Sequence, residues 1–176
     1  MTDYYINTEN LTSFADKLSV GDKVYLSGEI YTARDAAHKR LCALIDENKP
    51  LPFDIRGAVI YFAGPSPTKE DGTIGSFGPT TSSRMDAFSP VLLDIGLCGM
   101  IGKGNRSREV VDAVVRNRGI YFCSGGGFGA LISQSIVNVE EIAFPELGCE
   151  SIKRLYVENM PLTVAIDCFG NSIFDR

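Results

Sequence analysis

Apolar residues follow two different spacings along the chain. In some stretches they recur three and four positions apart, which is typical of a helix with one buried face. In others, β-branched and aromatic residues form short runs bounded by glycine or proline, which is typical of strands. Helices are predicted at residues 10–18, 34–48, about 81–95, about 107–115 and 130–136, and strands at residues 23–32, 58–63, 73–77, 98–101, 119–123, 139–144, 153–157 and 162–167. Ser89-Pro90 either interrupts the helix at about 81–95 or starts a second helix.

This alternation predicts a single α/β domain with a mixed sheet and flanking helices, because strands that alternate with helices favour a sheet covered by helices. No repeat, low-complexity run or linker divides residues 1–176. Residues 1–20 are predicted to form an N-terminal extension or docking helix. A bulge or bend is expected near Gly28, inside the first long strand.

Two segments between the predicted elements are rich in turn residues. Residues 68–72 (TKEDG) indicate a solvated loop or hairpin tip. The glycine run 124–129 lies between a strand and a helix, an arrangement that can cradle phosphate. No acidic residue follows it at the spacing of a ribose-binding carboxylate. We therefore interpret the run as close helix packing or the wall of a pocket.

Composition argues against several classes of function. The formal net charge is −5, which disfavours a broad surface for nucleic acid or anionic membrane. No apolar run approaches the length of a membrane span and the polar N-terminus has no signal-peptide core, so a cytoplasmic protein is expected. The five cysteines are widely spaced and His38 is the only histidine, so no metal site is expected within this chain. We interpret His38 as a polar-face or supporting residue.

The segment Gly78–Asp86, with the sequence GPTTSSRMD, is the richest in candidate chemistry. A Gly-Pro turn ends a strand, and Thr80 or Thr81 is a candidate N-cap for a following helix. The N–H groups of such a helix start, together with the Arg84 guanidinium, would bind an anion, and a nearby hydroxyl could take part in proton transfer. The alternative is an ordinary capped helix with an exposed arginine.

Two further cations follow predicted strands. Arg34 opens a helix, where a positive charge is unfavourable unless it serves an anion, although pairing with Asp35 or Glu29 is an alternative. Lys103 lies between two glycines, which let the backbone approach a ligand closely, and its loop lacks the Walker A pattern. Because strand exits meet at one edge of an α/β sheet, Arg34, Arg84 and Lys103 together predict a site for a small dicarboxylate.

Several segments give the chain a specific resemblance to a known family. Residues 32–40 (TARDAAHKR), 78–86 (GPTTSSRMD), 100–104 (MIGKG), 160–167 and 170–172 resemble, in the same order, segments of the class I, iron–sulfur-dependent fumarases. The resemblance is to their C-terminal domain or separate β subunit, and it extends from about Gly21 to Phe174. The β subunits of L(+)-tartrate dehydratases share this scaffold.

The resemblance implies a swivelling β/β/α domain that closes one side of an active site. It also implies a partner α subunit, in an α2β2-type assembly, that holds a [4Fe–4S] cluster acting as a Lewis acid. Arg34, Arg84 and Lys103 match positions that hold substrate carboxylates, and Thr81 would lie beside the substrate. Thr80 matches the proposed catalytic base for the C3 proton of malate. A threonine hydroxyl is a weak base, so Thr80 needs activation by Lys103 and the arginines.

The resulting hypothesis is a β subunit of a hydro-lyase that interconverts fumarate and (S)-malate, active only with its cluster-bearing partner. An L(+)-tartrate dehydratase β subunit, which would serve the conversion of tartrate to oxaloacetate, is the alternative within the superfamily. Ala33 before Arg34, Ala36-Ala37 after it, and Asp86 after Met85 favour the fumarases. A non-catalytic dicarboxylate-binding module is the alternative from a different class.

Overall fold

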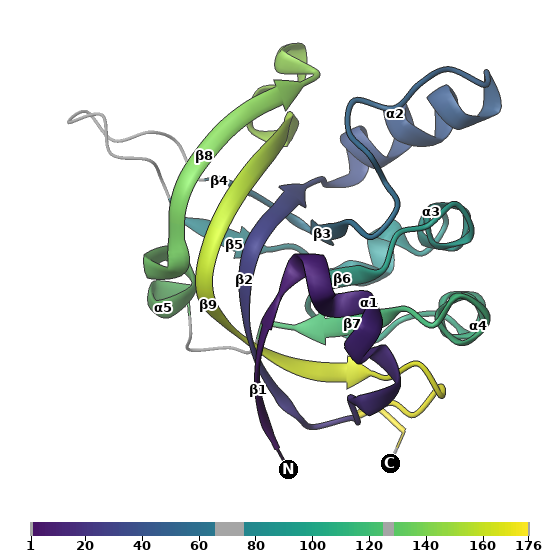
Figure 1. Ribbon diagram of the computed structural model, residues 1–176. Helices are drawn as coiled ribbons and strands as arrows, with labels where there is room; N and C mark the ends of the chain where they lie inside the picture. Colours follow the sequence, from purple (N-terminus) through teal and green to yellow (C-terminus); the bar gives the residue numbers. More distant parts are fainter. Residues whose placement is uncertain (1, 66–75, 125–128, 176) are drawn as a thin grey trace.

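The protein is a mixed α/β structure in which one large sheet carries helices along one side (Figure 1). The computed structural model describes residues 2–65, 76–124 and 129–175. The strands are β1 (Asp3–Asn7), β2 (Lys23–Thr32), β3 (Val59–Tyr61), β4 (Ala63–Pro65), β5 (Phe77–Pro79), β6 (Gly99–Gly102), β7 (Ile120–Cys123), β8 (Ile136–Ala143) and β9 (Ile152–Ile166). The helices are α1 (Leu11–Phe14), α2 (Asp35–Asp46), α3 (Ser89–Asp94), α4 (Arg108–Asn117) and α5 (Gly129–Ser135), with the 3₁₀ turns η1 (Thr8–Asn10), η2 (Ala15–Lys17), η3 (Ser82–Met85) and η4 (Pro145–Glu150).

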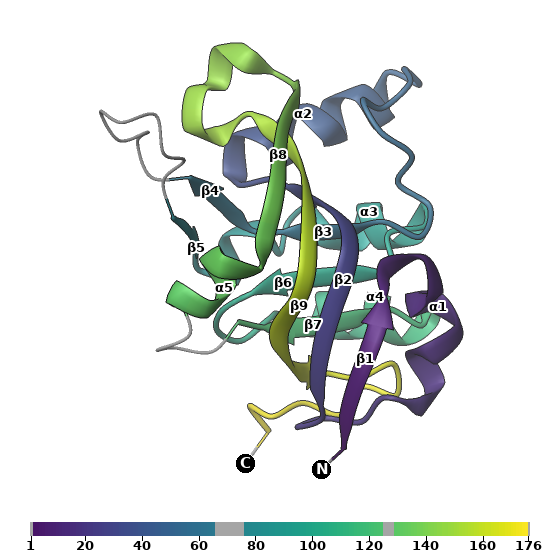
Figure 2. The ribbon, with the colours of Figure 1, turned by 60° about the vertical axis from the view of Figure 1, so that its left-hand side comes forward.

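The seven strands of the main sheet follow the order β1-β2-β3-β6-β7-β9-β8, and β9 pairs with β2 as well. Strands β2, β3, β6 and β7 are parallel to one another, whereas β9 runs antiparallel to β2, β7 and β8. Residues 153–163 of β9 pair with β2, and residues 163–166 pair with β7. The long, curved β9 therefore closes the sheet partly on itself (Figure 2).

Alternation along the strands divides the buried side chains into two cores. Val59 and Tyr61 of β3 belong to the core enclosed by the strands, which Leu11 and Leu18 also enter. The intervening Ile60 belongs to a second core, beneath the helices. Helices α2, α3 and α4 lie together on that side of the sheet (Figure 1). The strands thus separate an interior core from a core covered by helices.

Many predicted elements are present close to their expected bounds. The predicted helical stretch at 10–18 is η1, α1 and η2 in succession. Strand β2 contains the expected irregularity: the register shifts between Leu26 and Gly28, and Gly28 has a φ of +117°. The helix predicted at about 107–115 is α4, and Ser107 is its N-cap residue, whose Oγ accepts from the Val110 N–H at 3.3 Å. These predictions are confirmed.

Some predicted elements differ in extent. The strands predicted at 153–157 and 162–167 are one strand, because Met160 and Pro161 stay paired with β2. The helix predicted over 81–95 is η3 followed by α3, since Pro90 begins a new helix in its first turn. Residues 3–7 form an edge strand parallel to β2. Docking by residues 1–20 stays a prediction.

Three predicted features lie wholly or partly outside the described residues. They are the loop at 68–72, most of the glycine run at 124–129, and the first part of the strand at 73–77, of which Phe77 belongs to β5. In the part of the chain that the structure describes, no helix combines the length and the apolar character needed to cross a membrane.

Candidate functional site

The carboxyl ends of parallel strands bring the three predicted segments to one edge of the sheet. Arg34 follows β2 and is the N-cap residue of α2. Lys103 follows β6 directly. Thr80 follows β5, and its N–H donates to the Phe62 carbonyl oxygen at 2.8 Å, beside the end of β3. The fold therefore places Arg34 and Lys103 at the exits of β2 and β6, and Thr80 beside the end of β3, which lies between them in the sheet.

Direct contacts join these three segments. Thr81 forms an isolated parallel bridge with Lys103. On the other side of the segment, Arg84 Nε lies 2.8 Å from Asp35 Oδ2, next to Arg34 in sequence. Thr80 is half-buried, whereas Thr81, Arg84 and Lys103 are exposed. Their roles in binding and catalysis stay predictions.

Arg34 has unused hydrogen-bonding capacity. Its Nε atom is buried and has no hydrogen-bond partner among the described residues. The Arg34 side chain passes Gly64 of β4, where an added Cβ would lie 3.4 Å from Arg34 Cδ and 2.6 Å from the Cys149 carbonyl oxygen. Glycine at position 64 therefore lets η4 and Arg34 approach the β4–β5 hairpin. A guanidinium with a buried, unpaired N–H is suited to receive a carboxylate.

A carboxylate of the chain already accepts a hydrogen bond at the start of helix α2. Glu150 Oε1 accepts a hydrogen bond from the Ala36 N–H at 3.3 Å. An external anion shared between Arg34 and this helix start, as the sequence suggested, would have to displace Glu150. The guanidinium of Arg34 is consequently the better candidate for contact with a ligand.

The structure also corrects the interpretation of Gly78–Asp86. Thr81 is the residue before η3, but its side chain makes no capping hydrogen bond. The turn is only four residues long, and the Ser82 N–H already donates to the Lys103 carbonyl oxygen. The predicted capping by Thr81 and the alternative of a single helix over 81–95 are therefore wrong. Anion binding by this segment stays a prediction.

A buried ion pair, which the sequence analysis missed, anchors this segment. Arg106 Nε lies 2.7 Å from Asp86 Oδ1, and the Arg106 side chain is fully buried. Its guanidinium carbon is 5.1 Å from the centre of the Phe62 ring and 4.8 Å from that of Tyr121. The second Asp86 oxygen accepts from the Ser107 N–H at 2.7 Å. Asp86 thus ties the end of η3 to the loop after β6.

His38 is buried, so its predicted place on a polar face is wrong. Nδ1 lies 2.9 Å from the Arg34 carbonyl oxygen, and a carbonyl only accepts, so Nδ1 carries the proton. Nε2 has no partner among the described residues, and the ring packs against Phe62 and Phe88. Desolvation lowers the pKa of His38 to about 4. The neutral ring supports the backbone of Arg34 and is no candidate for acid–base catalysis near neutral pH.

The cysteines of this chain do not suit an iron–sulfur cluster. Within the described ranges, no three His, Cys, Asp or Glu residues gather in a way that could hold a metal ion. Cys98 and Cys168 are buried and donate to the carbonyl oxygens of Gly57 and Ala15. Burial raises the pKa of Cys98 to about 11, which keeps it a thiol. The described residues therefore do not fit a [4Fe–4S] cluster.

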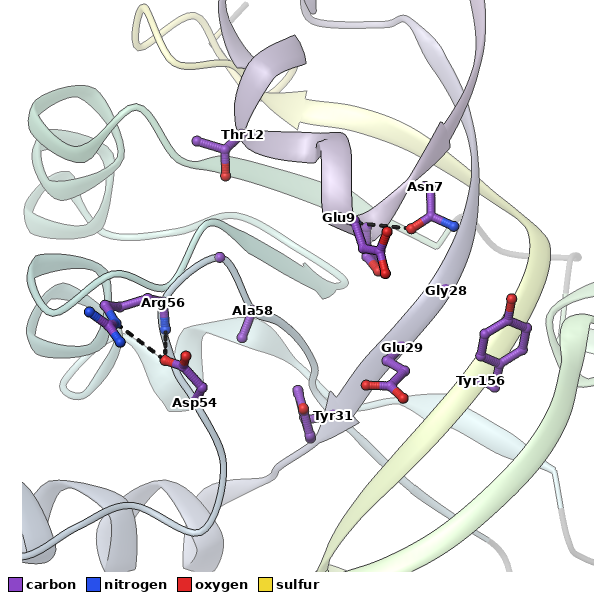
Figure 3. Close-up of a pocket in the computed structure, with 12 residues that line it drawn as sticks. Asn7, Glu9, Thr12, Gly28, Glu29, Tyr31, Asp54, Arg56, Ala58 and Tyr156 are labelled. Carbon is purple, nitrogen blue, oxygen red and sulfur yellow. Dashed lines mark hydrogen bonds and ion pairs between the residues drawn. The ribbon is translucent and has the colours of Figure 1, made fainter.

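A cavity of about 490 Å³ (Figure 3) has no residue of the three predicted segments in its lining. Its wall includes Glu9, Glu29 and Asp54, with Arg56 as the one arginine or lysine of the lining. Asp54 is paired with Arg56, so Glu9 and Glu29 leave this lining net negative, which disfavours a dicarboxylate. The edge that carries Arg34, Thr80 and Lys103 is the better candidate for such a ligand.

Comparison with known proteins gives a consistent family. A family model described as Fumarase C-terminus matches residues 3–176. Fumarate hydratase 2 of Leishmania major is 39% identical over 159 residues, which are 89% of this chain and 28% of that protein. The anaerobic class I fumarate hydratase of Escherichia coli is 42% identical over 159 residues, 89% of this chain and 29% of that protein. The putative L(+)-tartrate dehydratase subunit beta of Methanocaldococcus jannaschii is 39% identical over 166 residues, 91% of this chain and 85% of that protein.

The relatives differ in how much of their length the chain accounts for. It spans less than a third of each of these two fumarate hydratases, but most of the tartrate dehydratase subunit. The family model covers nearly the whole chain. This protein therefore belongs to the fumarase C-terminus family.

Proposed function

We propose that this chain is the β subunit of an iron–sulfur-dependent hydro-lyase that interconverts fumarate and (S)-malate. The observation that carries the proposal is Arg34, whose buried Nε lacks a partner among the described residues at the edge that also presents Thr80 and Lys103. A dicarboxylate would supply the missing acceptor. Family membership supports the same reaction class.

Two observations support a second subunit. The chain covers 85% and 79% of two proteins named as tartrate dehydratase β subunits, but under a third of the two fumarate hydratases described above. The described cysteines do not gather into a cluster site. In the proposal, a partner α subunit holds the [4Fe–4S] cluster, which supplies Lewis acidity toward the substrate. This chain supplies the other wall of the site.

The proposed roles follow from charge and position. Arg34, Arg84 and Lys103 bind the two substrate carboxylates, since arginine forms bidentate pairs and lysine adds a point charge. Thr80 removes the C3 proton of malate, and Thr81 lies beside the carbon chain. The positive charges around Thr80 stabilise its ionised form, which an isolated threonine would not reach near neutral pH. The acid that protonates the departing hydroxide comes from the partner.

The proposal also covers the motion of the domain, the assembly of the subunits and their location in the cell. The strand layers and the helical layer form a swivelling β/β/α domain that closes over the substrate. The assembly contains two α and two β subunits and works in the cytoplasm. Rotation of the domain relative to the α subunit would bring Arg34 and Thr80 to the substrate.

The test is reconstitution with a cluster-bearing α subunit and assay against fumarate, mesaconate and L-tartrate. We expect fumarate hydration to dominate. Thr80→Ala and Lys103→Ala should each lower kcat by a factor of about 10²–10⁴, the usual range for a lost proton-transfer group. Ser83→Ala, at an exposed hydroxyl in the same segment, is the matched control. Near-normal turnover in Thr80→Ala or Lys103→Ala would remove that residue from the catalytic set.

Tartrate dehydration is the second candidate, because relatives similar in length to this chain carry that name. Dominant turnover of L-tartrate in the same assay would establish it in place of fumarate hydration. Tight dicarboxylate binding by a chain that joins no α subunit would instead indicate a binding module.

A further inference from the structure

Ser82, which has no role in the reaction proposed above, holds the backbone of Lys103 by two hydrogen bonds. The Ser82 N–H donates to the Lys103 carbonyl oxygen at 2.9 Å. In return, the Lys103 N–H donates to Ser82 Oγ at 3.0 Å. Ser82 is fully buried, so water does not compete for either bond. Through this residue, η3 is joined to the loop after β6.

Tyr121 completes the hydrogen bonding of Ser82. The Tyr121 hydroxyl oxygen lies 2.8 Å from Ser82 Oγ and 2.8 Å from the Gly104 carbonyl oxygen. A phenol has one proton and a carbonyl oxygen only accepts, so Tyr121 donates to Gly104 and accepts from Ser82. Burial raises the pKa of Tyr121, which keeps this proton in place at neutral pH. Hydrogen bonds therefore run from the Lys103 amide through Ser82 and Tyr121 to the Gly104 carbonyl.

The neighbours of Lys103 explain why its backbone needs such support. Gly104 has a φ of +86°, a conformation that glycine adopts readily. A Cβ at Gly102 would collide with Ser82 Oγ, so only glycine lets the hydroxyl come this close. Glycine on both sides leaves Lys103 without adjacent side chains to pack, and the lysine itself is exposed. The hydrogen bonds to Ser82 hold the Lys103 backbone in place, whereas side-chain packing does not.

We propose that Ser82, supported by Tyr121, is a positioning residue for Lys103. It fixes the backbone from which the lysine ammonium reaches a dicarboxylate beside Thr80, and this last step rests on the proposed function. Ser82 itself contacts no substrate. Its effect on the reaction passes through Lys103 alone.

Hydrogen exchange at the Lys103 amide, followed by NMR in the full chain, tests the hold on the backbone. Ser82→Ala removes the acceptor, and exchange at this amide should accelerate by about tenfold or more. Tyr121→Phe keeps the ring packing and should accelerate exchange at the Lys103 amide less than Ser82→Ala does. Ser83→Ala should leave it unchanged, because Ser83 is exposed. Equal exchange rates in Ser82→Ala and Ser83→Ala would overturn the proposal.

A double-mutant cycle in the reconstituted enzyme tests the link to the lysine. Ser82→Ala should lower kcat/KM about tenfold, and it should have no further effect in a Lys103→Ala background. Independent, additive losses would overturn the positioning role. Tyr121→Phe serves as a second variant if Ser82→Ala folds poorly, with the same expected coupling to Lys103. A wild-type complex without activity would refute the proposed reaction, while the exchange measurement would still decide whether Ser82 holds Lys103.

Discussion

Lys103 follows β6 and Arg34 follows β2, the two strands on either side of β3, yet their surroundings differ. Near Lys103, the buried Ser82 is hydrogen-bonded to Tyr121, and the buried Arg106 is paired with Asp86. Around Arg34, a buried Nε and the Asp35 Oδ1 atom have no partners among the described residues.

The difference separates two tasks within one site. A fully paired, buried network has a single arrangement and holds its neighbours still. Buried polar atoms without partners instead carry a free-energy penalty that a ligand or another subunit can relieve. Under the proposed function, the Lys103 side is a fixed platform, and the Arg34 side is the part that a ligand or another subunit would complete.

The largest expected effect on stability comes from a change at the Lys103 side, the fixed platform. Asp86→Ala leaves the buried Arg106 charge without its carboxylate, which should lower the free energy of unfolding by about 3–5 kcal/mol. Urea denaturation measures this loss. Asp94→Ala is the matched control, because it breaks the exposed Asp94–Arg116 pair and should change stability by about 1 kcal/mol or less. Equal losses in the two variants would contradict the idea of a rigid platform.

The support beneath Arg34 should be sensitive to acid. The pKa of His38 is lowered to about 4 from its ordinary 6.5, so between these values the unfolded chain binds a proton that the folded chain excludes. Stability should therefore fall as the pH drops from about 6.5 to about 4, by roughly 3 kcal/mol from this group.

Denaturation across that pH range checks the prediction, with His38→Phe as the comparison. The variant has no histidine, so it retains only the pH dependence of the carboxyl groups. Identical slopes for wild type and His38→Phe would show that His38 does not titrate as its burial implies.

A smaller effect should follow from filling the space beside Arg34. In Gly64→Ala the new Cβ meets the Cys149 carbonyl oxygen, so η4 must shift, and overpacking of this kind costs about 1–3 kcal/mol. The directly paired Gly78 offers the control, because a Cβ there meets nothing within 4 Å. Thermal unfolding of Gly64→Ala and Gly78→Ala compares them, and equally stable variants would contradict the close approach of η4.

The smallest effect on stability should come from Arg84→Ala. The Arg84 side chain is 54% exposed, and such pairs contribute about 1 kcal/mol or less. The same variant should raise KM for the dicarboxylate about tenfold in the assembled enzyme, as expected for one lost charge-assisted contact. Unchanged KM would remove Arg84 from the binding set.

The strand exits were predictable because each carries a local signal. Arg34 stands at a helix start, Lys103 lies between glycines, and Gly78–Asp86 follows a turn. Parallel strands β2, β3 and β6 then bring them to one edge. The family resemblance identified the same segments, and the family model confirms it.

The buried polar contacts were not predictable in the same way. The sequence around Arg106 reads as an exposed loop, and nothing local indicates that Phe62 and Tyr121 enclose its guanidinium. A signal for His38 did exist, because Leu41 and Ile45 lie three and seven positions later, on the same helix face. The interpretation from sequence relied on the polar side chain of His38 and gave too little weight to its place on this helix face. For Arg106, the partners are set by tertiary packing.

Strand β9 also constrains the order in which this molecule can be made. It is translated after β2, β7 and β8, and it forms hydrogen bonds with all three strands. The Lys153 N–H, for example, donates to Thr32 Oγ1, which lies 121 residues earlier in the chain. Contacts over such separations form slowly, and unpaired strand edges promote aggregation until they are covered. Until β9 has been synthesised, the edges of β2, β7 and β8 that pair with it therefore stay uncovered, so completion of the sheet waits for the last long strand of the chain.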